Sequence, residues 1–342
     1  MNTGTMPYTL VNNIEKLIIT FLENLISCKQ GICKFKSRRN QNLPLIEQII
    51  SCKSTGAPRF SICFYILMEA HNRLLAGDKC TLRELYYKDP AKCCKPVSIS
   101  KGVIDVCAIL QTVPWNLGIF ATGKGLIAGA IRFHMINGDM IDCFTHGGAV
   151  VLPQDHNSIN RLETSATFVL VVEKETVFSK LISQKIFENL GMDIILMTGR
   201  GYPDLSTRYI INRLSTIHKL PIYALFDADP FGIEILLIYQ FGSRKMSREI
   251  SKNLICPKMR WIGIHPTELV IFNFPHVALS ANDNRKLQRM LRYSYIKDGI
   301  RFELQTLQHL QRKIHIDELH SISELFLLND YMPNKIKRNL ML

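Results

Sequence analysis

Three carboxylate side chains follow strand-like apolar runs in the second half of the sequence. Glu173 comes directly after residues 169–172, and Asp227 and Asp229 follow residues 223–226. Because open α/β sheets bind ligands beyond the carboxyl ends of their strands, we expect these three side chains to lie together. Asp227 and Asp229 are two residues apart, so continued strand geometry turns both to the same side.

A cluster of carboxylates needs a cation to be stable. Two carboxylates about 4 Å apart repel each other by roughly 4 kcal/mol at an effective dielectric of about 20. Oxygen ligands with no nearby histidine or cysteine favour Mg²⁺, or alternatively Mn²⁺, over zinc. Taken singly, Glu173 is equally compatible with a helix N-cap, and the Asp227 and Asp229 pair with a solvated turn. Their joint occurrence, in sheet order, favours a metal site.

A pair of tyrosines in Arg83-Glu84-Leu85-Tyr86-Tyr87 offers a nucleophile. Successive helical residues diverge by about 100°, so only one phenol can serve a given site. Arg83 and Tyr87 share a helix face, where the guanidinium could bind a phosphate and favour the phenolate. A free phenol, with a pKa of about 10, needs such activation. We predict Tyr87 as the nucleophile and Tyr86 as its packing partner, although tyrosine pairs on amphipathic helices more often belong to a core.

A glycine-rich segment, Thr198-Gly199-Arg200-Gly201-Tyr202-Pro203-Asp204, follows a strand-like run and opens a helix-like one. Backbone amides and the Arg200 guanidinium could bind an anion there. The segment matches neither the GxGxxG fingerprint of dinucleotide-binding folds nor the GxxxxGK[ST] phosphate loop. The sequence therefore offers a phosphate contact at Arg200 and no ATP site.

The elements that must carry the tyrosines are predicted in the first half of the chain. Apolar residues at three- and four-residue steps indicate a helix over residues 10–28, which either folds back on its own chain or docks a second protein. The basic run at residues 34–40 is interpreted as a linker. A helix is predicted over residues 60–75, and a capping box formed by Thr81 and Glu84 begins the next helix.

Hairpins are predicted after these helices. A further helix is expected over residues 99–110. Residues 122–125, TGKG, are interpreted as the tip of one hairpin between two strand-like runs, and Asn137-Gly138-Asp139 as the turn of a second. Helices followed by a hairpin with glycine and lysine at its tip predict a winged helix-turn-helix domain.

Strands and helices alternate from residue 166 onward. This alternation predicts an α/β domain with a mostly parallel sheet covered by helices on both faces. The boundary before it is predicted near residues 153–165, where residues 153–157, PQDHN, are interpreted as a surface linker. The predicted strands are residues 168–172, 194–197, 222–226 and 261–264, and the predicted helices between them include residues 177–190 and 205–217.

Three regions follow from these patterns. Residues 1–42 form an N-terminal helix with a basic linker, residues 43–155 form the winged-helix domain that carries the tyrosine, and residues 156–342 form the α/β domain that carries the acidic side chains. A chain of 342 residues is long enough for two such domains.

The charge and the cysteines restrict the partners and the compartment. The formal charge of +13 favours nucleic acid over a membrane surface as the partner. No apolar stretch reaches the roughly 18 residues that span a bilayer, and no secretory signal opens the chain, so we expect the protein to stay inside the cell. The ten cysteines form no CxxC pair and no zinc spacing, which predicts free thiols in a reducing compartment.

Together these motifs resemble those of the meiotic double-strand-break transesterases and of their relative, the A subunit of archaeal topoisomerase VI. The resemblance covers residues 43–340. Phe231 departs from the pattern, since the family often has histidine or tyrosine there. The matching motifs, in the family's order, are Arg83-Glu84-Leu85-Tyr86-Tyr87, Lys124-Gly125-Leu126-Ile127-Ala128-Gly129, Val171-Val172-Glu173-Lys174-Glu175 with Phe178, Gly201-Tyr202-Pro203-Asp204, Asp227-Ala228-Asp229-Pro230 with Gly232, and Trp261-Ile262-Gly263.

The resemblance implies a winged-helix domain followed by a metal-binding Toprim domain. It implies that Tyr87, assisted by Arg83, attacks duplex DNA and stays joined to the 5′ phosphate. Lys124 would contact DNA from the wing. The Toprim metal ligands would be Glu173, Asp227 and Asp229.

The resemblance also implies partners. Two copies would act together on DNA, the tyrosine of one facing the metal site of the other. The N-terminal helix would dock a B-type, ATPase-like subunit. The basic run at residues 34–39 is compatible with a nuclear address or with a solvated linker. This run and the ten cysteines favour a meiotic enzyme of the nucleus over the A subunit of a type IIB topoisomerase.

Two alternatives come from other functional classes. A Toprim hydrolase or primase needs the carboxylates without the phenol. A DNA-binding scaffold without tyrosine chemistry needs only the basic surface.

Overall fold

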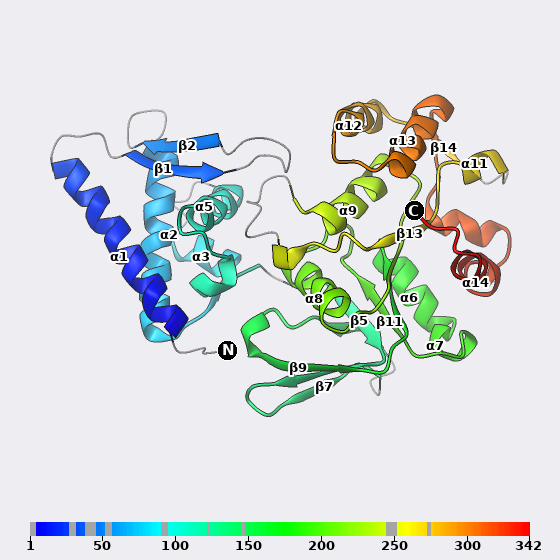
Figure 1. Cartoon of the computed structure of the whole chain (residues 1–342), viewed down its shortest axis with the longest axis horizontal. Helices are drawn as coiled ribbons and strands as arrows, with labels where there is room; N and C mark the ends of the chain where they lie inside the picture. Colours follow the sequence, from blue (N-terminus) through cyan, green and yellow to red (C-terminus); the bar gives the residue numbers. More distant parts are fainter. Residues whose placement is uncertain are drawn as a thin grey trace. The chain divides into compact units, whose positions relative to one another are not determined.

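The chain forms two compact units, coloured along the sequence in Figure 1. Unit 1 comprises residues 1–122 with 243–252, and unit 2 comprises residues 123–242 with 253–342. The predicted tyrosines therefore belong to unit 1 and the predicted carboxylates to unit 2. The computed structural model describes residues 5–26, 32–37, 46–51, 57–89, 95–121, 123–144, 148–243, 252–271 and 275–342.

Unit 1 contains helices and short strands. In chain order they are α1 (Thr5–Ile26), β1 (Ile32–Ser37), β2 (Ile46–Ser51), α2 (Ala57–Ala76), β3 (Cys80–Thr81), α3 (Leu82–Lys88), α5 (Pro96–Ile109), η1 (Pro114–Leu117) and β4 (Ile119–Phe120).

Unit 2 contains a six-stranded sheet, a three-stranded sheet and helices. No helix among the described residues of either unit has the length and apolar character to cross a membrane. The elements before residue 243 are β5 (Leu126–Gly129), β6 (Ile131–Met135), β7 (Met140–Asp142), β8 (Val150–Val151), η2 (His156–Ser158), β9 (Ile159–Thr164), β10 (Phe168–Val172), α6 (Glu175–Ser183), α7 (Ile186–Asn189), β11 (Ile194–Thr198), α8 (Leu205–Thr216), β12 (Ile222–Leu225) and α9 (Pro230–Phe241). After η3 (Lys252–Leu254) come β13 (Arg260–Gly263), α11 (Glu268–Ile271), β14 (Val277–Ala278), α12 (Ala281–Leu291), α13 (Asp298–Leu310), β15 (Arg312–Lys313), η4 (Ile316–Ser321), η5 (Leu327–Tyr331) and α14 (Met332–Lys337).

The N-terminal helix α1 folds back onto α2. It buries Val11, Ile14 and Phe21, and the ring of Phe21 lies 5.3 Å from that of Phe60 on α2. The helix predicted over residues 10–28 is therefore confirmed, with ends at residues 5 and 26. Its apolar stripe packs against its own chain, which was one of the two possibilities given for this helix. Docking of a second protein on its outer face stays a prediction.

The helix that carries the tyrosines begins where the sequence predicts. The backbone N–H of Glu84 donates to the Thr81 hydroxyl at 3.1 Å, and the N–H of Thr81 donates to the Glu84 carboxylate at 2.7 Å. These two bonds form the predicted capping box. Leu85 is fully buried, and its carbonyl accepts a hydrogen bond from the Tyr65 hydroxyl on α2 at 3.0 Å. The short helix α3 is thus fixed at its start and along one face.

The basic run after α1 is not a linker, contrary to prediction. Residues 34–37 lie in β1, which pairs antiparallel with β2. The alternation of Lys34 and Lys36 with Cys33 and Phe35 gives the period of two that a strand requires. The remainder of the run, from residue 38, lies outside the described residues.

The hairpin predicted around residues 122–125 does not form. β4 pairs with β3 in unit 1, whereas β5 pairs with β11 and β8 in unit 2. The glycine-rich segment is therefore the connection between the units, and Thr122 itself lies outside the described residues. The predicted helices over residues 60–75 and 99–110 are confirmed as α2 and α5. The winged-helix assignment stays a prediction.

A six-stranded sheet with the order β13-β12-β10-β11-β5-β8 forms the centre of unit 2. The four strands predicted from apolar runs are β10 to β13, and they are parallel. β5 and β8 extend the sheet in antiparallel pairing. The mostly parallel α/β sheet is therefore confirmed.

Helices cover both faces of this sheet (Figure 1). Successive side chains of β10 point to opposite faces. Val169 and Val171 pack in a core with α8, α9, α12 and α13, and Leu170 and Val172 pack in a second core with α6, α7, η4, η5 and α14. The helix predicted over residues 177–190 is divided into α6 and α7.

Residues 153–165, around the predicted boundary, lead into a three-stranded sheet, β7-β6-β9, and the linker predicted at residues 153–157 ends in η2. This stretch contains η2 and β9, and β9 pairs antiparallel with β6. Ile159 and Leu162 are buried, which explains why the stretch is folded and not extended over the surface. The predicted boundary between residues 155 and 156 lies inside unit 2. The turn predicted at Asn137-Gly138-Asp139 connects β6 to β7.

Candidate metal centre and tyrosine helix

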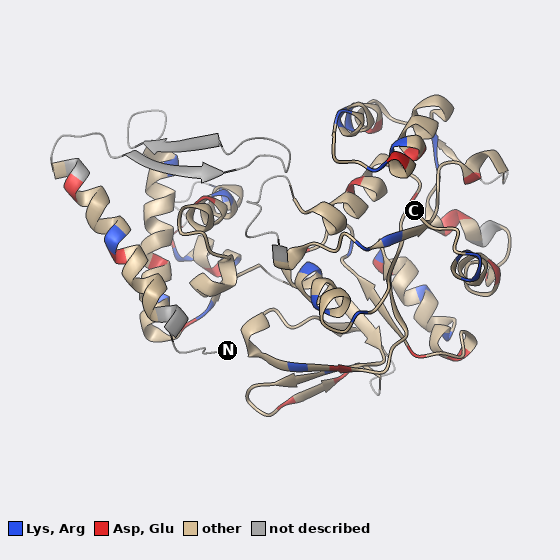
Figure 2. Ribbon diagram, viewed as in Figure 1, with Lys and Arg blue, Asp and Glu red and all other residues tan. Residues whose placement is uncertain are grey.

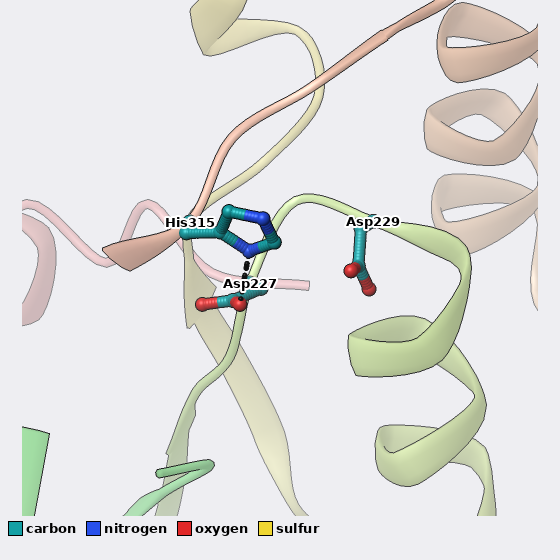
Figure 3. Close-up of side chains that lie close together, drawn as sticks. All are labelled: Asp227, Asp229 and His315. Atoms are coloured by element: carbon teal, nitrogen blue, oxygen red, sulfur yellow. Dashed lines mark hydrogen bonds and ion pairs between the residues drawn. The ribbon is translucent and has the colours of Figure 1, made fainter. Parts of the chain in front are cut away.

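The three predicted carboxylates gather at the carboxyl ends of neighbouring strands. β10 and β12 are parallel, with Val172 opposite Leu225, so Glu173 and Asp227 leave the sheet at the same edge. The backbone N–H of Asp227 donates to Glu173 Oε2 at 3.0 Å. Ligand atoms of Asp227 and Asp229 lie within 4.8 Å of each other (Figure 3). The structure therefore brings together the carboxylates that the sequence singled out.

Asp229 is both an acid of this centre and the N-cap of α9. Its Oδ1 accepts hydrogen bonds from the backbone N–H groups of Phe231 at 2.8 Å and Gly232 at 2.7 Å. A Cβ at residue 232 would lie 2.9 Å from Glu173 Oε2 and 2.5 Å from the Asp227 carbonyl oxygen. Only glycine therefore lets α9 begin this close to the carboxylates. No described residue donates to Asp229 Oδ2, which leaves that oxygen for a ligand.

A segment near the C-terminal end of unit 2 holds Asp227. Asp227 Oδ1 accepts from the backbone N–H of Ile316 at 2.9 Å, and Oδ2 accepts from His315 Nδ1 at 2.7 Å. Lys174 Nζ lies 2.9 Å from the same Oδ2. Ala228 and Ile314 form an antiparallel bridge that brings this segment to the carboxylates. The centre is therefore built from β10, β12 and a segment almost 90 residues farther along the chain.

His315 is a candidate ligand that the sequence analysis did not find. It forms a compact group with Asp227 and Asp229, each offering one ligand atom within 4.8 Å of the others (Figure 3). The expectation that no histidine lies near the carboxylates is therefore wrong. Nothing in the local spacing signals His315, because only the bridge between Ala228 and Ile314 brings it to the site.

The electrostatics of the centre are those of crowded, buried acids. Burial, followed by the charges of Asp227 and Asp229, raises the pKa of Glu173 to about 8. Burial also raises the pKa of Asp229. Burial alone would raise the pKa of Asp227 too, but the hydrogen bond from His315 and the Lys174 ammonium outweigh it and lower that pKa. Two of the three acids thus resist ionisation, and a cation would relieve them.

Tyr87 is presented to solvent by α3. Its side chain is 71% exposed, whereas Tyr86 is half-buried and meets the Tyr87 ring edge-on at 5.2 Å. Arg83 is exposed one turn earlier on the same helix. The exposures agree with Tyr87 as the reactive phenol and Tyr86 as its packing partner, but the role itself stays a prediction.

Lys124 and Arg200, the two predicted DNA contacts, lie next to each other in unit 2. Lys124 Nζ donates to the backbone carbonyl of Arg200 at 3.1 Å, and the Arg200 guanidinium pairs with Glu175 at 2.7 Å. The Asp204 carboxylate accepts from the backbone N–H groups of Lys124 at 2.7 Å and of Thr207 at 2.7 Å. The chain's own acid thus occupies amides at the start of α8, where an external anion was expected. The two cations remain as candidate contacts.

Models of known families match both units. One, described as the Toprim domain of Spo11 and of the topoisomerase 6 A subunit, matches residues 168–336, which include the acidic centre. Another, described as type IIB DNA topoisomerase, matches residues 58–119, which include α3.

Known proteins are similar over most of the chain. Meiotic recombination protein W68 of Drosophila melanogaster is 41% identical over 333 residues, which cover 96% of this chain and 98% of that protein. Meiotic recombination protein SPO11 of Homo sapiens is 33% identical over 295 residues, or 85% of this chain and 74% of that protein. The A subunit of DNA topoisomerase 6 of Arabidopsis thaliana is 29% identical over 344 residues, or 95% and 79%. With matches this long in both units, the chain belongs to the family of Spo11 and the A subunit of topoisomerase 6.

Proposed function

We propose that this chain is a DNA-cleaving transesterase that forms double-strand breaks in meiosis, with Tyr87 as its nucleophile. The main observation behind the proposal is that one chain contains both an exposed phenol and a buried acidic centre. Tyr87 lies in the residues that match the type IIB topoisomerase model, and the acidic centre lies in those that match the Toprim model. The similarity to a meiotic recombination protein over 96% of the chain supports the meiotic role. A nuclear location is part of the proposal, because meiotic recombination acts on chromosomal DNA.

In the proposed reaction one phosphodiester is exchanged for another. The Tyr87 phenol loses its proton, and its oxygen attacks a backbone phosphorus. The bond from phosphorus to the 3′ oxygen breaks, that oxygen takes up a proton, and the 5′ phosphate stays joined to Tyr87. Arg83, one turn earlier on α3, binds the attacked phosphate and favours the phenolate over the phenol. Because no water attacks, the energy of the broken bond is kept in the phosphotyrosine.

The acidic centre fits a hard divalent cation. Glu173, Asp227 and Asp229 are each at least nine-tenths buried, and the raised pKa values of Glu173 and Asp229 are the cost of burying acids without a counter-ion. We assign these three residues to Mg²⁺, with Mn²⁺ as the alternative. The bound ion would stabilise charge on the phosphate and the leaving oxygen. Lys174 holds Asp227 in place beside the site.

Two copies are proposed to act together on duplex DNA, the tyrosine of one serving the acidic centre of the other. Lys and Arg occur on elements of both units (Figure 2), and the formal charge of +13 favours the DNA backbone as partner. Lys124 and Arg200 are the proposed phosphate contacts in unit 2. A B-type, ATPase-like subunit is proposed to dock on the outer face of α1, where Ile19 and Leu22 are exposed.

The assignment of the nucleophile is tested by comparing two neighbouring phenols. Tyr87→Phe removes the attacking oxygen and should abolish covalent protein–DNA adducts. Tyr86→Phe is the matched control and should retain them. The measurement is the amount of labelled DNA that stays bound to the full-length protein after denaturation, with mass spectrometry of the residue that carries the nucleotide. Adducts that persist in Tyr87→Phe would refute the assignment.

A second candidate is the A subunit of a type IIB topoisomerase. The A3 subunit of DNA topoisomerase 6 of Oryza sativa subsp. indica is 28% identical over 349 residues, which cover 96% of this chain. A topoisomerase must reseal the break after passing a second duplex through it. Relaxation of supercoiled DNA by the chain with an ATPase partner and ATP would favour this candidate, whereas adducts without relaxation favour the recombination enzyme.

A further inference from the structure

We infer that the exposed face of α12 is a phosphate-binding surface that holds the DNA backbone beside the acidic centre. The inference rests on the proposed function, in which DNA is the partner, and deepens it by naming a surface that none of the sequence motifs includes. Its positive charge comes from Arg285 and Arg289 in α12 and from Arg292, the C-cap of that helix.

The three arginines lie on one side of α12. At about 100° per residue, their spacing of four and then three residues places them within about 60° of one another around the helix axis. All three are exposed, and Figure 2 shows the blue of Lys and Arg on this helix. The opposite side of α12 is buried against the rest of unit 2 through Asp283, Leu287 and Met290. The helix therefore has one packed face and one basic face.

No acid shares the basic face. Its other exposed positions are Ala281, Asn282 and Gln288. Asp283, the acid of this helix, is buried and pairs with Lys313 at 2.9 Å. Within the described part of the chain, no acid forms an ion pair with Arg285 or Arg292. The charge of the face is therefore largely uncompensated.

This charge is concentrated in a short stretch of sequence. Residues 277–297 contain five lysines and arginines and one acid, so these 21 of 342 residues supply four of the chain's thirteen net positive charges. Like charges one turn apart destabilise a helix. The isolated protein thus gains no stability from the row of arginines, whereas a polyanion bound to it would relieve the repulsion.

The helix that carries this face packs beside the acidic centre. α12 contacts α9, which begins at Asp229 (Figure 1). The Lys286 ammonium of α12 lies 4.1 Å from the centroid of the Phe231 ring, and the Phe231 N–H donates to Asp229 Oδ1 at 2.8 Å. The Arg289 guanidinium donates to Glu234 on α9 at 3.0 Å. A DNA strand whose phosphate reaches the acidic centre can therefore continue along α12 within unit 2.

Both ends of α12 are fixed. Ser280 and Asp283 form a capping box at its start. At its end, the Arg301 guanidinium donates to the carbonyls of Leu291 and Tyr293, each at 2.8 Å. The backbone that carries the arginines is therefore ordered before a ligand arrives, which lowers the entropy cost of binding.

The chemistry of the face favours a nucleic acid over an acidic protein. The row from Arg285 to Arg292 is about 10 Å long at about 1.5 Å per residue, and duplex DNA carries about six phosphates over that length. Protein interfaces depend on buried apolar or aromatic anchors. None of the exposed large apolar side chains of the described residues lies on α12. Charge alone is offered here, which matches a phosphate backbone.

The experiment removes two of the charges and leaves the fold in place. Arg285→Gln and Arg292→Gln are combined in one variant of the full-length protein, because glutamine has a helix propensity close to that of arginine. The control combines Lys337→Gln and Arg338→Gln, which remove two exposed cations at the end of α14, in the core on the other face of the six-stranded sheet. Urea unfolding checks that both variants are folded.

The measurement is the affinity for duplex DNA in a chelator, which prevents cleavage, at several salt concentrations between about 50 and 200 mM. The slope of log affinity against log salt should fall by about two in the α12 variant and stay unchanged in the α14 control. A third variant with Arg285→Lys and Arg292→Lys keeps both charges and should keep the wild-type slope. The same proteins are titrated with poly-glutamate as an acidic-protein probe.

The outcomes separate this inference from the proposed function. A steep wild-type slope that is unchanged in the α12 variant overturns the inference and leaves the proposed function intact. Equal losses in the α12 and α14 variants also overturn it, because net charge alone then sets the slope. Loss of poly-glutamate binding with an unchanged DNA slope assigns the face to an acidic protein and overturns it as well. Wild-type protein that does not bind DNA overturns both proposals, and the adduct test on Tyr87 is read independently of the salt slope.

Discussion

At the scale of single residues, the carboxylates of the acidic centre repel one another in the folded protein. Glu173 is buried beside Asp227 and Asp229, which raises its pKa to about 8. An acid whose pKa rises on folding keeps its proton in the folded state at pH values where the unfolded chain has lost it. Its contribution to the stability of the metal-free protein is therefore lost as the pH rises from about 4.5 to about 8.

Glu173→Gln should remove this pH dependence. Replacing the acid by its neutral isostere leaves no proton to lose, so the variant's advantage in the free energy of unfolding should grow by about 1 kcal/mol for each pH unit in that window. The measurement is urea unfolding of both proteins in a chelator at several pH values between about 5 and 8. Parallel curves for the two proteins would show that Glu173 ionises normally in the fold.

The residues of the centre differ in how far the sequence reveals them. Glu173, Asp227 and Asp229 could be predicted because each follows a strand that is readable as an apolar run, and parallel strands end at one edge. His315 and Lys174 could not be predicted to meet at Asp227 in this way. Lys174 follows Glu173 at the end of β10 and reaches Asp227 from the neighbouring strand. The contact of His315 depends on the bridge between Ala228 and Ile314, which leaves no periodic trace in the sequence.

At the scale of elements, α3 depends on its first turn. The helix is only seven residues long, so the capping box at Thr81 and Glu84 satisfies a large share of its otherwise unpaired amides. Because Tyr87 lies near its other end, any fraying of α3 moves the phenol.

Thr81→Ala should therefore loosen the tyrosine helix. Loss of the hydroxyl acceptor is expected to lower the free energy of unfolding by about 1 kcal/mol and to reduce the yield of covalent adducts. Thr81→Ser keeps the acceptor and is the matched control, with near wild-type values. The measurements are chemical denaturation and the adduct assay. Equal behaviour of the alanine and serine variants would show that the cap contributes nothing to α3.

Elements with a clear apolar periodicity in the sequence could be predicted. Elements that depend on which strands pair with each other could not. The helices α2 and α5 and the strands β10 to β13 follow from apolar periodicity. The basic run that includes β1 was interpreted as a linker because its charge outweighed the alternation of Lys34 and Lys36 with Cys33 and Phe35. The glycines at residues 122–125 suggested a turn, but strands on either side of them pair with different partners.

At the scale of the whole molecule, the proposed arrangement divides one active site between two copies. A protein carrying Tyr87→Phe still has an intact acidic centre, and one carrying Glu173→Gln still has its phenol. Mixed dimers of the two should contain one site with both parts, whereas each variant alone has none.

Mixing the two variants should therefore restore cleavage of a single strand per dimer. The expected products are nicks with protein bound to one 5′ end. If the two variants are equal in amount and combine at random, about half of the dimers are mixed and can make such a nick. The measurement is the adduct assay on duplexes labelled on either strand. Mixtures as inactive as the separate variants would indicate that the phenol and the acids act within one copy.

Binding to DNA should weaken steeply with salt. If the protein neutralises about 6 to 10 phosphates, its affinity should fall by roughly 10³- to 10⁵-fold between about 50 and 200 mM salt. Lys124→Ala and Arg200→Ala should each reduce the slope of log affinity against log salt by about one. Lys185→Ala, at the N-cap of α7, serves as control, because the Lys185 ammonium pairs with Glu188. A slope unchanged by the first two substitutions would remove these residues from the DNA contacts.

Asp227 accepts hydrogen bonds from His315 and Ile316, next to the bridge between Ile314 and Ala228. These contacts have a consequence for the order in which the site forms during translation. While the chain is being translated, β10 and β12 can emerge and pair, yet Asp227 lacks its contacts with His315 and Ile316 until residue 316 has left the ribosome. A nascent or prematurely terminated polypeptide thus carries the phenol long before it carries a finished ion-binding centre. The proposed cleavage would therefore require residues 314–316 as well as the phenol of Tyr87.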